Sequence, residues 1–211
     1  MAKSKRDAYA TKQRIIEEAR SLFSKRGYDA TTVDDIAAAS EINKALIYYY
    51  FKNKAQLYAT IMSGLFDAIY DEVIVASKRC SSVEEELSVF IRTYAEYAYT
   101  NPYFPALLLR ELSDSGAHLP EMMFVSMRRL FLLLSNILKR GEEGGVFLHS
   151  IAMVVHFMIV GSLNLMVTTQ SLREKAEEMD SAVDTCSKCS MEEVAAYIYE
   201  TIKKSLEVKL G

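Results

Sequence analysis

The chain has 211 residues, half of them hydrophobic, which is enough to bury a core and excludes a largely disordered protein. With only 8 Gly and 3 Pro it lacks the turn residues that a sandwich or barrel of many short strands requires. The formal net charge is -3, but residues 1–60 carry 11 Lys+Arg against 7 Asp+Glu, and the remainder is acidic. A basic segment on an acidic body is typical of a small nucleic-acid-binding domain joined to a larger non-binding domain.

Apolar residues at three- and four-residue spacing predict helices in the first part of the chain over 11–26, 33–39, 44–51 and 54–79. Gly27 follows the first helix and is a typical terminator. Thr32, with Asp35 three residues later, resembles a capping box in which Asp replaces the usual Glu or Gln, and this pair marks the start of the second helix. Asn53 is the predicted cap of the long fourth helix.

The same spacing predicts further helices over 83–100, 105–112, 120–140, 150–169 and 191–206. Ser82 is the predicted cap of the first of these, and Pro105 and Pro120 start the next two. The sequence GEEGG after residue 140 and the polar stretch 170–190 are interpreted as non-helical. The pattern therefore predicts an all-α fold.

Two short helices around a four-residue turn, braced by the helix before them, form a helix-turn-helix unit. This unit and its flanks contain Gly27, Tyr28, Thr31, Thr32, Val33, Ile36, Ala37, Ile42, Lys44, Ile47, Tyr48, Tyr50, Phe51, Lys52, Lys54 and Leu57. These residues resemble the N-terminal signature of the tetracycline-repressor (TetR) family of transcriptional regulators. The resemblance covers residues 11–57 and implies a homodimeric, all-helical DNA-binding protein whose C-terminal domain senses a ligand.

We therefore expect a three-helix helix-turn-helix DNA-binding domain over residues 1–53 and a helical effector-binding and dimerisation domain over residues 54–211. The helix over 54–79 is expected to be the direct covalent route between them. The expected function is that of a ligand-responsive transcriptional regulator, a repressor released from a palindromic operator by an apolar or amphipathic small molecule. The alternatives are a helical protein-interaction module that contacts no DNA and an enzyme on a helical scaffold.

Three positions depart from the family pattern. Glu41 lies in the turn where the family usually has Gly, and a left-handed conformation there would cost roughly 1 kcal/mol. Ala45 replaces another common Gly, and Leu46 replaces a common Thr or Ser. An apolar side chain at position 46 suits a thymine methyl group, so the operator sequence of other family members does not transfer to this chain.

The predicted DNA-binding residues are Thr32, Lys44, Ala45, Leu46, Tyr48, Tyr49, Tyr50 and Lys54. Lys44 begins the recognition helix and can donate to guanine O6 and N7. The three tyrosines span nearly one turn, so we expect one or two hydroxyls to reach phosphate while another ring packs with Phe51; the alternative is three core tyrosines. Thr32 and Lys54 begin helices and are expected to contact phosphate, with a merely solvated charge as the alternative for Lys54.

Aromatic rings and flexible thioethers on several helices of the C-terminal part predict an adaptable apolar cavity, with ordinary core packing as the alternative. The predicted ligand-binding residues are Tyr94, Tyr97, Phe104, Met123, Met127, Phe131 and Phe157.

Residues 144–172 contain no Asp, Glu, Lys or Arg, a length that could cross a bilayer. The polar residues within this stretch favour instead a helix buried between its own domain and a partner subunit. The family resemblance implies that this helix and the last one form a four-helix dimer interface, although packing within one chain would also produce the apolar stripe of the last helix. The predicted interface residues are His156, Val160, Val194, Ile198, Ile202 and Leu206.

No catalytic residue, metal site or cofactor is predicted, because the chain shows neither a phosphate-binding loop nor a Ser, His and acid arrangement. The pair Cys186 and Cys189 is interpreted as incidental, with thiol sensing as the alternative. The histidines at 118, 149 and 156 are interpreted as structural or solvated. The polar, basic start shows no signal peptide, so we expect a cytoplasmic protein with reduced thiols and no membrane partner.

Overall fold

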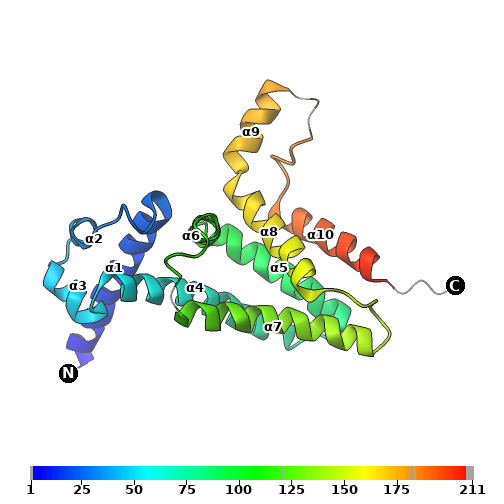
Figure 1. Ribbon diagram of the computed structural model, residues 1–211, viewed down its shortest axis with the longest axis horizontal. Coiled ribbons are helices and arrows are strands. Elements are labelled where there is room, and N and C mark those ends of the chain that lie inside the picture. The colour runs from blue at the N-terminus through cyan, green and yellow to red at the C-terminus, as the bar shows by residue number, and fades with distance from the viewer. Residues whose placement is uncertain (1, 120, 181, 183, 208–211) are drawn as a thin grey trace. The chain divides into compact units, whose positions relative to one another are not determined.

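The computed structural model describes residues 2–119, 121–180, 182 and 184–207, with the backbone alone for residues 2–5. Within these ranges the chain is all-α, as predicted, and its only β feature is an isolated bridge between Phe147 and Glu207 (Figure 1). The helices are α1 (Ala2–Arg26), α2 (Val33–Ser40), α3 (Lys44–Phe51), α4 (Lys54–Ser77), α5 (Val83–Thr100), α6 (Tyr103–Ser113), α7 (Glu121–Glu143), α8 (Ala152–Thr168), α9 (Gln170–Met179) and α10 (Met191–Leu206).

Most predicted boundaries agree with these helices to within two or three residues, and the predicted start of α7 at Pro120 lies outside the described residues. Helix α9 was not predicted, because only Leu172, Ala176 and Met179 are apolar in an otherwise polar sequence, and none of its residues is buried. Helix α7 continues through Gly141, where a Cβ would lie 2.0 Å from the ring of Phe147. That glycine serves close packing rather than helix termination, so the prediction of a loop at its position is wrong.

The chain forms two compact units, Met1–Phe66 with Ala106–Ser126 and Asp67–Pro105 with Met127–Gly211. This division differs from the expected boundary after residue 53, because Leu57, Tyr58 and Met62 on α4 are buried in the first unit. The chain passes between the units inside α4, inside α6 and inside α7. The expectation of one covalent route through α4 is therefore wrong.

In the first unit, local side-chain bonds set the helix ends. Gly27 has φ +83° and ends α1, with its N–H donating to Phe23 O at 2.9 Å. The predicted capping box is present: Asp35 N donates to Thr32 Oγ1 at 3.1 Å, and Thr32 N donates to Asp35 Oδ2 at 2.9 Å. Glu41 ends α2 in the left-handed conformation, with φ +52°, which is the geometry that the missing glycine would have favoured. This turn fixes the angle at which α3 leaves α2.

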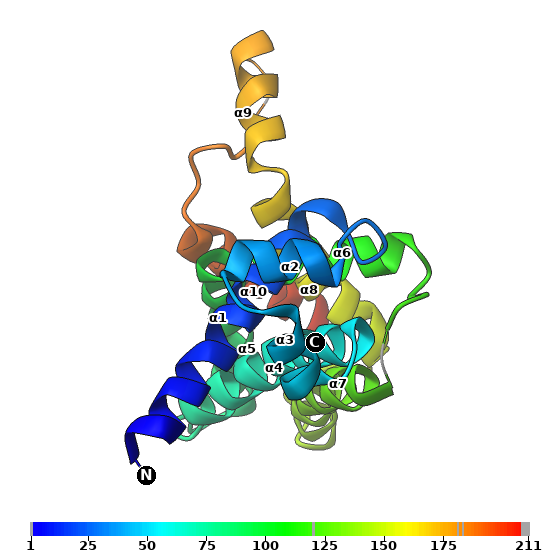
Figure 2. The same ribbon diagram turned by 90° about the vertical axis from the view of Figure 1, so that its left-hand side faces the viewer.

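The core of the first unit holds the recognition helix in place. Ile47 and Phe51 of α3 are buried, as are Ile36 of α2 and Phe23 of α1. The Phe23 ring meets Tyr58 of α4 edge to face at 4.9 Å between ring centres. Figure 2 shows α2 and α3 side by side, turned toward the reader, with α1 next to them.

In the second unit, α5 packs against α10 and α8. Tyr94 of α5 is fully buried and donates to Asn164 Oδ1 of α8 at 3.2 Å. Helix α9 bends by 67° from α8 and extends away from the other helices of this unit (Figure 1). In the described residues no single helix is both long and apolar enough to cross a membrane, whereas the bent pair α8 and α9 together meets the criteria of length and composition.

Candidate functional site

Helix α3, the predicted recognition helix, has one exposed side. Its exposed side chains include Ala45, Leu46, Tyr48 and Tyr49, and Tyr49 is 78% exposed. Tyr50 is half-buried, with its ring 6.3 Å from that of Phe51 and 5.2 Å from that of Tyr49. The tyrosines therefore divide between surface and interior as expected, and the alternative of three core tyrosines is wrong.

Lys44, the predicted base contact, begins α3 but is not free. Its ammonium lies 2.8 Å from the carboxylate of Asp34 on α2, and this hydrogen bond raises the pKa of Lys44. The Lys44 side chain is 44% exposed and that of Asp34 is 73% exposed, so the pair can separate when a stronger acceptor approaches. The contact between Lys44 and guanine stays a prediction, with Asp34 as a competing acceptor that the sequence analysis did not identify.

Thr32 is exposed at the N-terminus of α2, but its hydroxyl already donates to Asp35 Oδ2 at 2.6 Å. The hydrogen bonds from Thr32 lower the pKa of Asp35, which keeps that carboxylate charged. Asp34 adds a second negative charge in the same turn. Two carboxylates oppose the approach of a phosphate to this helix end, so the expected contact of Thr32 with DNA stays a prediction without support from the local charge.

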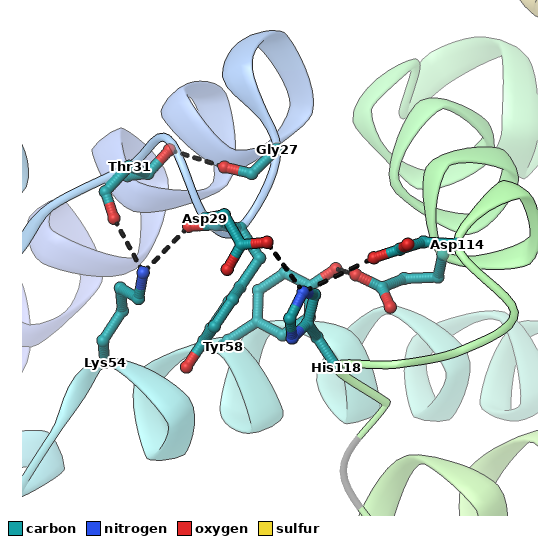
Figure 3. A network of polar contacts seen from close by, with 9 residues as sticks. Gly27, Asp29, Thr31, Lys54, Tyr58, Asp114 and His118 are labelled. Atoms are coloured by element: carbon teal, nitrogen blue, oxygen red, sulfur yellow. Dashed lines mark hydrogen bonds and ion pairs between the residues drawn. The ribbon is translucent and has the colours of Figure 1, made fainter.

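Lys54 has a structural role in this unit (Figure 3). Its ammonium donates to Tyr28 O at 2.9 Å and to Thr31 O at 3.1 Å, and it lies 4.1 Å from the centre of the Tyr28 ring. These contacts attach the loop between α1 and α2 to the first turn of α4. The alternative of a merely solvated charge is wrong, and a phosphate contact by the remaining donor of Lys54 stays a prediction.

A second set of contacts joins the segment between α6 and α7 to the same loop (Figure 3). The His118 ring stacks on the Tyr28 ring at 4.5 Å, and His118 Nε2 lies 3.1 Å from Asp29 Oδ2 and 3.4 Å from Asp114 Oδ2. The interpretation of His118 as structural agrees with this placement. Tyr28 thus lies between a lysine of α4 and a histidine that is distant in sequence.

Helix α6 adds two further attachments. Arg110 donates from Nε to Ser24 O and from Nη2 to Lys25 O, both at 2.9 Å, and so satisfies carbonyls of the last turn of α1. Glu111 is buried and accepts a hydrogen bond from the Tyr58 hydroxyl, whose pKa is raised first by burial and then by this bond. These residues place the second half of α6 in the helix-turn-helix unit. Sequence analysis missed them, because hydrogen bonds between residues more than fifty positions apart leave no periodic pattern.

The predicted ligand-binding residues do not come together. Tyr94, Tyr97 and Phe104 are buried against one another in the second unit, with ring centres 5.4 and 5.8 Å apart. Met123 is buried in the first unit, and Phe157 is 63% exposed on α8. Met127 and Phe131 lie half-buried on α7. For the three buried rings, the alternative of ordinary core packing describes the structure better than a shared cavity.

Two clefts in the second unit are lined by other residues. One of about 570 Å³ lies among α4, α5 and α10 and includes Arg92, Glu96 and Tyr99. Another of about 990 Å³ lies among α8, α9, α10 and the loop before α10, and includes Met166 and Tyr197. None of the seven predicted side chains lines either cleft.

The predicted dimer residues on α10 mostly point inward. Val194, Ile202 and Leu206 are buried within the protomer, because α10 packs on α5 and α8, and Ile198 is half-buried. Val160 of α8 is also buried. The stripe is therefore explained by packing within one chain. The exposed apolar side chains of these helices are Met153, Val154, Phe157, Met158, Leu165 and Tyr197.

Comparison with known proteins identifies the family. Residues 15–61 match the model of the bacterial regulatory proteins of the tetR family, and residues 84–187 match that of a tetracyclin repressor-like C-terminal domain. This chain belongs to the tetR family. The family consists of regulatory proteins, which are not enzymes.

Relatives of this TetR-family protein include YttP of Bacillus subtilis strain 168, a probable HTH-type transcriptional regulator, which is 26% identical over 64% of this chain and 66% of YttP. IcaR of Staphylococcus aureus strain Newman, a negative regulator of the biofilm operon icaADBC, is 30% identical over 49% of this chain and 62% of IcaR. The chain thus spans slightly less than two thirds of the length of these relatives. FadR of Bacillus subtilis, solved in complex with stearoyl-CoA, has the same fold, with a TM-score of 0.73, 18% identity and coverage of 92% of this chain and 98% of that chain.

His156 of the TetR-family chain is half-buried on α8, and its Nδ1 has no hydrogen-bond partner among the described residues. Its ring meets Phe131 edge to face at 5.5 Å between ring centres. Burial lowers the pKa of His156 and favours the neutral imidazole. The side chain was predicted at a dimer interface, and it packs in part within its own protomer.

The cysteines differ from the expectation of three reduced thiols. Cys186 and Cys189 form a disulfide in the loop between α9 and α10, whereas Cys80 is free. The loop thus brings both sulfurs together, and the interpretation of the pair as incidental to function stays a prediction. No group of side chains suited to hold a metal ion is found among the described residues.

Proposed function

We propose that this TetR-family chain is a cytoplasmic transcriptional repressor that binds a palindromic operator as a homodimer and releases it when a small molecule binds the second unit. The observation that carries the proposal is the surface of α3, whose core side chains and caps fix the helix while Leu46, Tyr48 and Tyr49 face outward. A rigid helix with an exposed reading face is what major-groove recognition requires. The negative regulator IcaR supports repression as the outcome of binding.

The exposed side chains suggest how the operator is recognised. Leu46 suits a thymine methyl group, and the hydroxyls of Tyr48 and Tyr49 suit phosphate oxygens at the edges of the groove. Lys44 contributes a base contact after its release from Asp34. Recognition by these groups favours sites that contain A·T pairs opposite Leu46.

The homodimer is supported by the exposed apolar side chains of α8. Met153, Phe157 and Leu165 lie at four- and eight-residue intervals on this helix, and Tyr197 of α10 is 75% exposed. Exposed apolar side chains of this kind are typical of protein interfaces. Pairing α8 and α10 with those of a second copy would cover it and set the spacing of the two recognition helices.

The effector is proposed to be apolar or amphipathic, because the second unit is rich in aromatic rings and thioethers. The same fold in FadR of Bacillus subtilis accommodates stearoyl-CoA, an amphipathic molecule. An effector that binds the DNA-free form better by about 1 to 3 kcal/mol would weaken operator binding roughly 5- to 150-fold. Operator DNA would weaken effector binding by the same factor.

The test is selection of bound fragments from random duplex DNA, followed by affinity measurements on the enriched site with wild type, Leu46→Ala and Leu132→Ala. Leu132 is a matched control, because it is 37% exposed on α7 and far from α3 in sequence. We expect a palindromic site, a loss of about 1 to 3 kcal/mol for Leu46→Ala at one base pair per half-site, and no change for Leu132→Ala. A chain that enriches no sequence and binds all duplexes equally would contradict the proposal and favour a protein-interaction module.

A further inference from the structure

The loop between α9 and α10 contains a closed pair of cysteines. Cys186 and Cys189 are joined by a disulfide, and their Cα atoms lie 5.1 Å apart. Cys186 has φ +51°, and Cys189 N donates to Cys186 O at 3.3 Å, so the backbone itself turns tightly between them. Cys189 is exposed and Cys186 is half-buried. Small thiols and disulfides can therefore reach this pair from solvent.

The turn between the two cysteines is attached to α9. Ser187 Oγ donates to a carboxylate oxygen of Glu177, and Lys188 Nζ donates to the other one at 2.7 Å. These two bonds lower the pKa of Glu177 and keep it charged. They are important for α9, because none of its own residues is buried. Arg173 Nη1 also attaches the start of α9 to α8 by donating to Met166 O at 2.6 Å, so it is the second half of α9 whose position depends on the turn that the disulfide closes.

The other end of the turn leads directly into α10. Ser190 follows Cys189 and caps α10, accepting from Glu193 N at 3.2 Å in a capping box. Cys189 thus stands one residue before the cap, near the positive end of the helix dipole, which favours a thiolate. Lys188 adds a positive charge beside it. Both cysteines also line the cleft of about 990 Å³, together with Tyr197.

We propose that Cys186 and Cys189 are a reversible dithiol–disulfide site, at which oxidation by a small-molecule disulfide fixes α9 to the start of α10 and reduction by a thiol releases it. This site rests on the proposed function, in which the chain is a cytoplasmic regulator of transcription. Disulfides there are usually transient and redox-responsive rather than permanent. The three-residue spacing and the solvent access of Cys189 suit such an exchange.

The exchange is balanced in two steps. The Cys189 thiolate attacks one sulfur of the small disulfide RSSR, forms a mixed disulfide and releases one RS⁻. The Cys186 thiolate then attacks Cys189 Sγ, forms the bond within the chain and releases the second RS⁻. Two protein thiols are oxidised, RSSR is reduced to two RSH, and the two thiol protons pass to the released thiolates. Excess RSH reverses both steps.

The experiment uses the full chain equilibrated with mixtures of reduced and oxidised glutathione, followed by alkylation, mass spectrometry and hydrogen exchange of residues 170–190. We expect one alkylated cysteine, Cys80, in oxidising mixtures and all three in reducing ones. Burial raises the pKa of Cys80, so Cys80→Ser is the matched control and leaves the redox response unchanged. Oxidation should slow exchange in α9 by about tenfold, as expected when local opening must also break the two bonds to Glu177.

Two variants separate the chemistry from its structural effect. Cys189→Ser should remove the redox dependence of exchange in α9. Glu177→Gln should leave the disulfide titration intact but make exchange in α9 fast in both redox states. The proposal is overturned if the pair stays reduced in every glutathione mixture, if it cannot be reduced, or if oxidation leaves exchange in α9 unchanged. Duplex binding is measured on the same samples, and its loss in both redox states counts against the proposed function alone.

Discussion

Replacing Lys54 by methionine tests whether this side chain holds the helix-turn-helix unit together or contacts DNA phosphate. Methionine keeps most of the length of the apolar stem but removes the ammonium that donates to Tyr28 O and Thr31 O and lies over the Tyr28 ring. The substitution therefore detaches the loop before α2 from the first turn of α4. We expect α2 and α3 to open more often, because this loop enters α2 directly.

The size of the effect follows from the contacts. Hydrogen bonds from a charged donor contribute about 1.5 kcal/mol each when, as here, the donor is only half-buried. The cation–π contact adds about 0.5 to 1 kcal/mol. Water solvates the freed carbonyls and offsets part of this free energy. The net loss in the free energy of local opening is roughly 2 to 3 kcal/mol. Local opening would become roughly 30- to 150-fold more frequent.

The assay is hydrogen exchange of the amides of α2 and α3, with duplex affinity measured across a range of salt concentrations. Lys44→Met is the matched control, because the ion pair of Lys44 with Asp34 lies at the surface, where such pairs contribute little to stability. We expect faster exchange of the amides of α2 and α3 in Lys54→Met and not in Lys44→Met. The salt dependence of duplex affinity should be the same for Lys54→Met as for the wild type. Unchanged exchange together with a salt slope shallower by about 1 would refute the structural role and establish a phosphate contact.

Three further predictions follow from the same contacts. Asp34→Asn frees Lys44, so affinity for any duplex should rise a few-fold and the salt slope should steepen by about 1 in fluorescence anisotropy; an unchanged slope would count against the pairing. Arg110→Met should destabilise the first unit by about 1 to 3 kcal/mol and speed exchange at the end of α1, and equal exchange would show that Arg110 is dispensable. Burial lowers the pKa of His156, so the unfolded chain binds a proton more readily than the folded one. The free energy of unfolding of the wild type should therefore fall as the pH drops below about 6.5, whereas His156→Leu should lack this part of the fall when thermal unfolding is measured across the same pH range.

The sequence was sufficient to predict the helices whose ends carry local signals. Thr32, Asn53 and Ser82 each cap the helix that was predicted to follow, because a capping bond joins residues two or three positions apart and is visible in the sequence. Helix α9 was missed because its sequence is mostly polar and its few apolar residues are not buried. Its contacts with the loop before α10 run through Glu177 and Lys188, charged residues that apolar periodicity does not register.

The apolar periodicity of α10 also did not determine whether its apolar face packs within the chain or against a partner subunit. Val194, Ile202 and Leu206 form a stripe that suits either a partner subunit or the rest of the same chain, and only the packing of α10 on α5 and α8 distinguishes the two. The outward face of α3 was predicted better. The side chains expected to contact DNA include the exposed Leu46, Tyr48 and Tyr49, whereas Ile47 and Phe51 are buried on the other side of the helix. The pairing of Lys44 with Asp34 could not be predicted from the sequence, because Asp34 lies on another helix.

The division of the chain into units changes how an effector signal can reach DNA. A single long connecting helix would make α4 the only element whose displacement moves the recognition helix. Here α4, α6 and α7 each contribute residues to both units, and a continuous helix transmits displacement better than a flexible linker does. Arg110 on α6 and His118 before α7 contact the end of α1 and the loop before α2. Weakening either contact should therefore reduce the response of operator binding to the effector even where α4 is untouched.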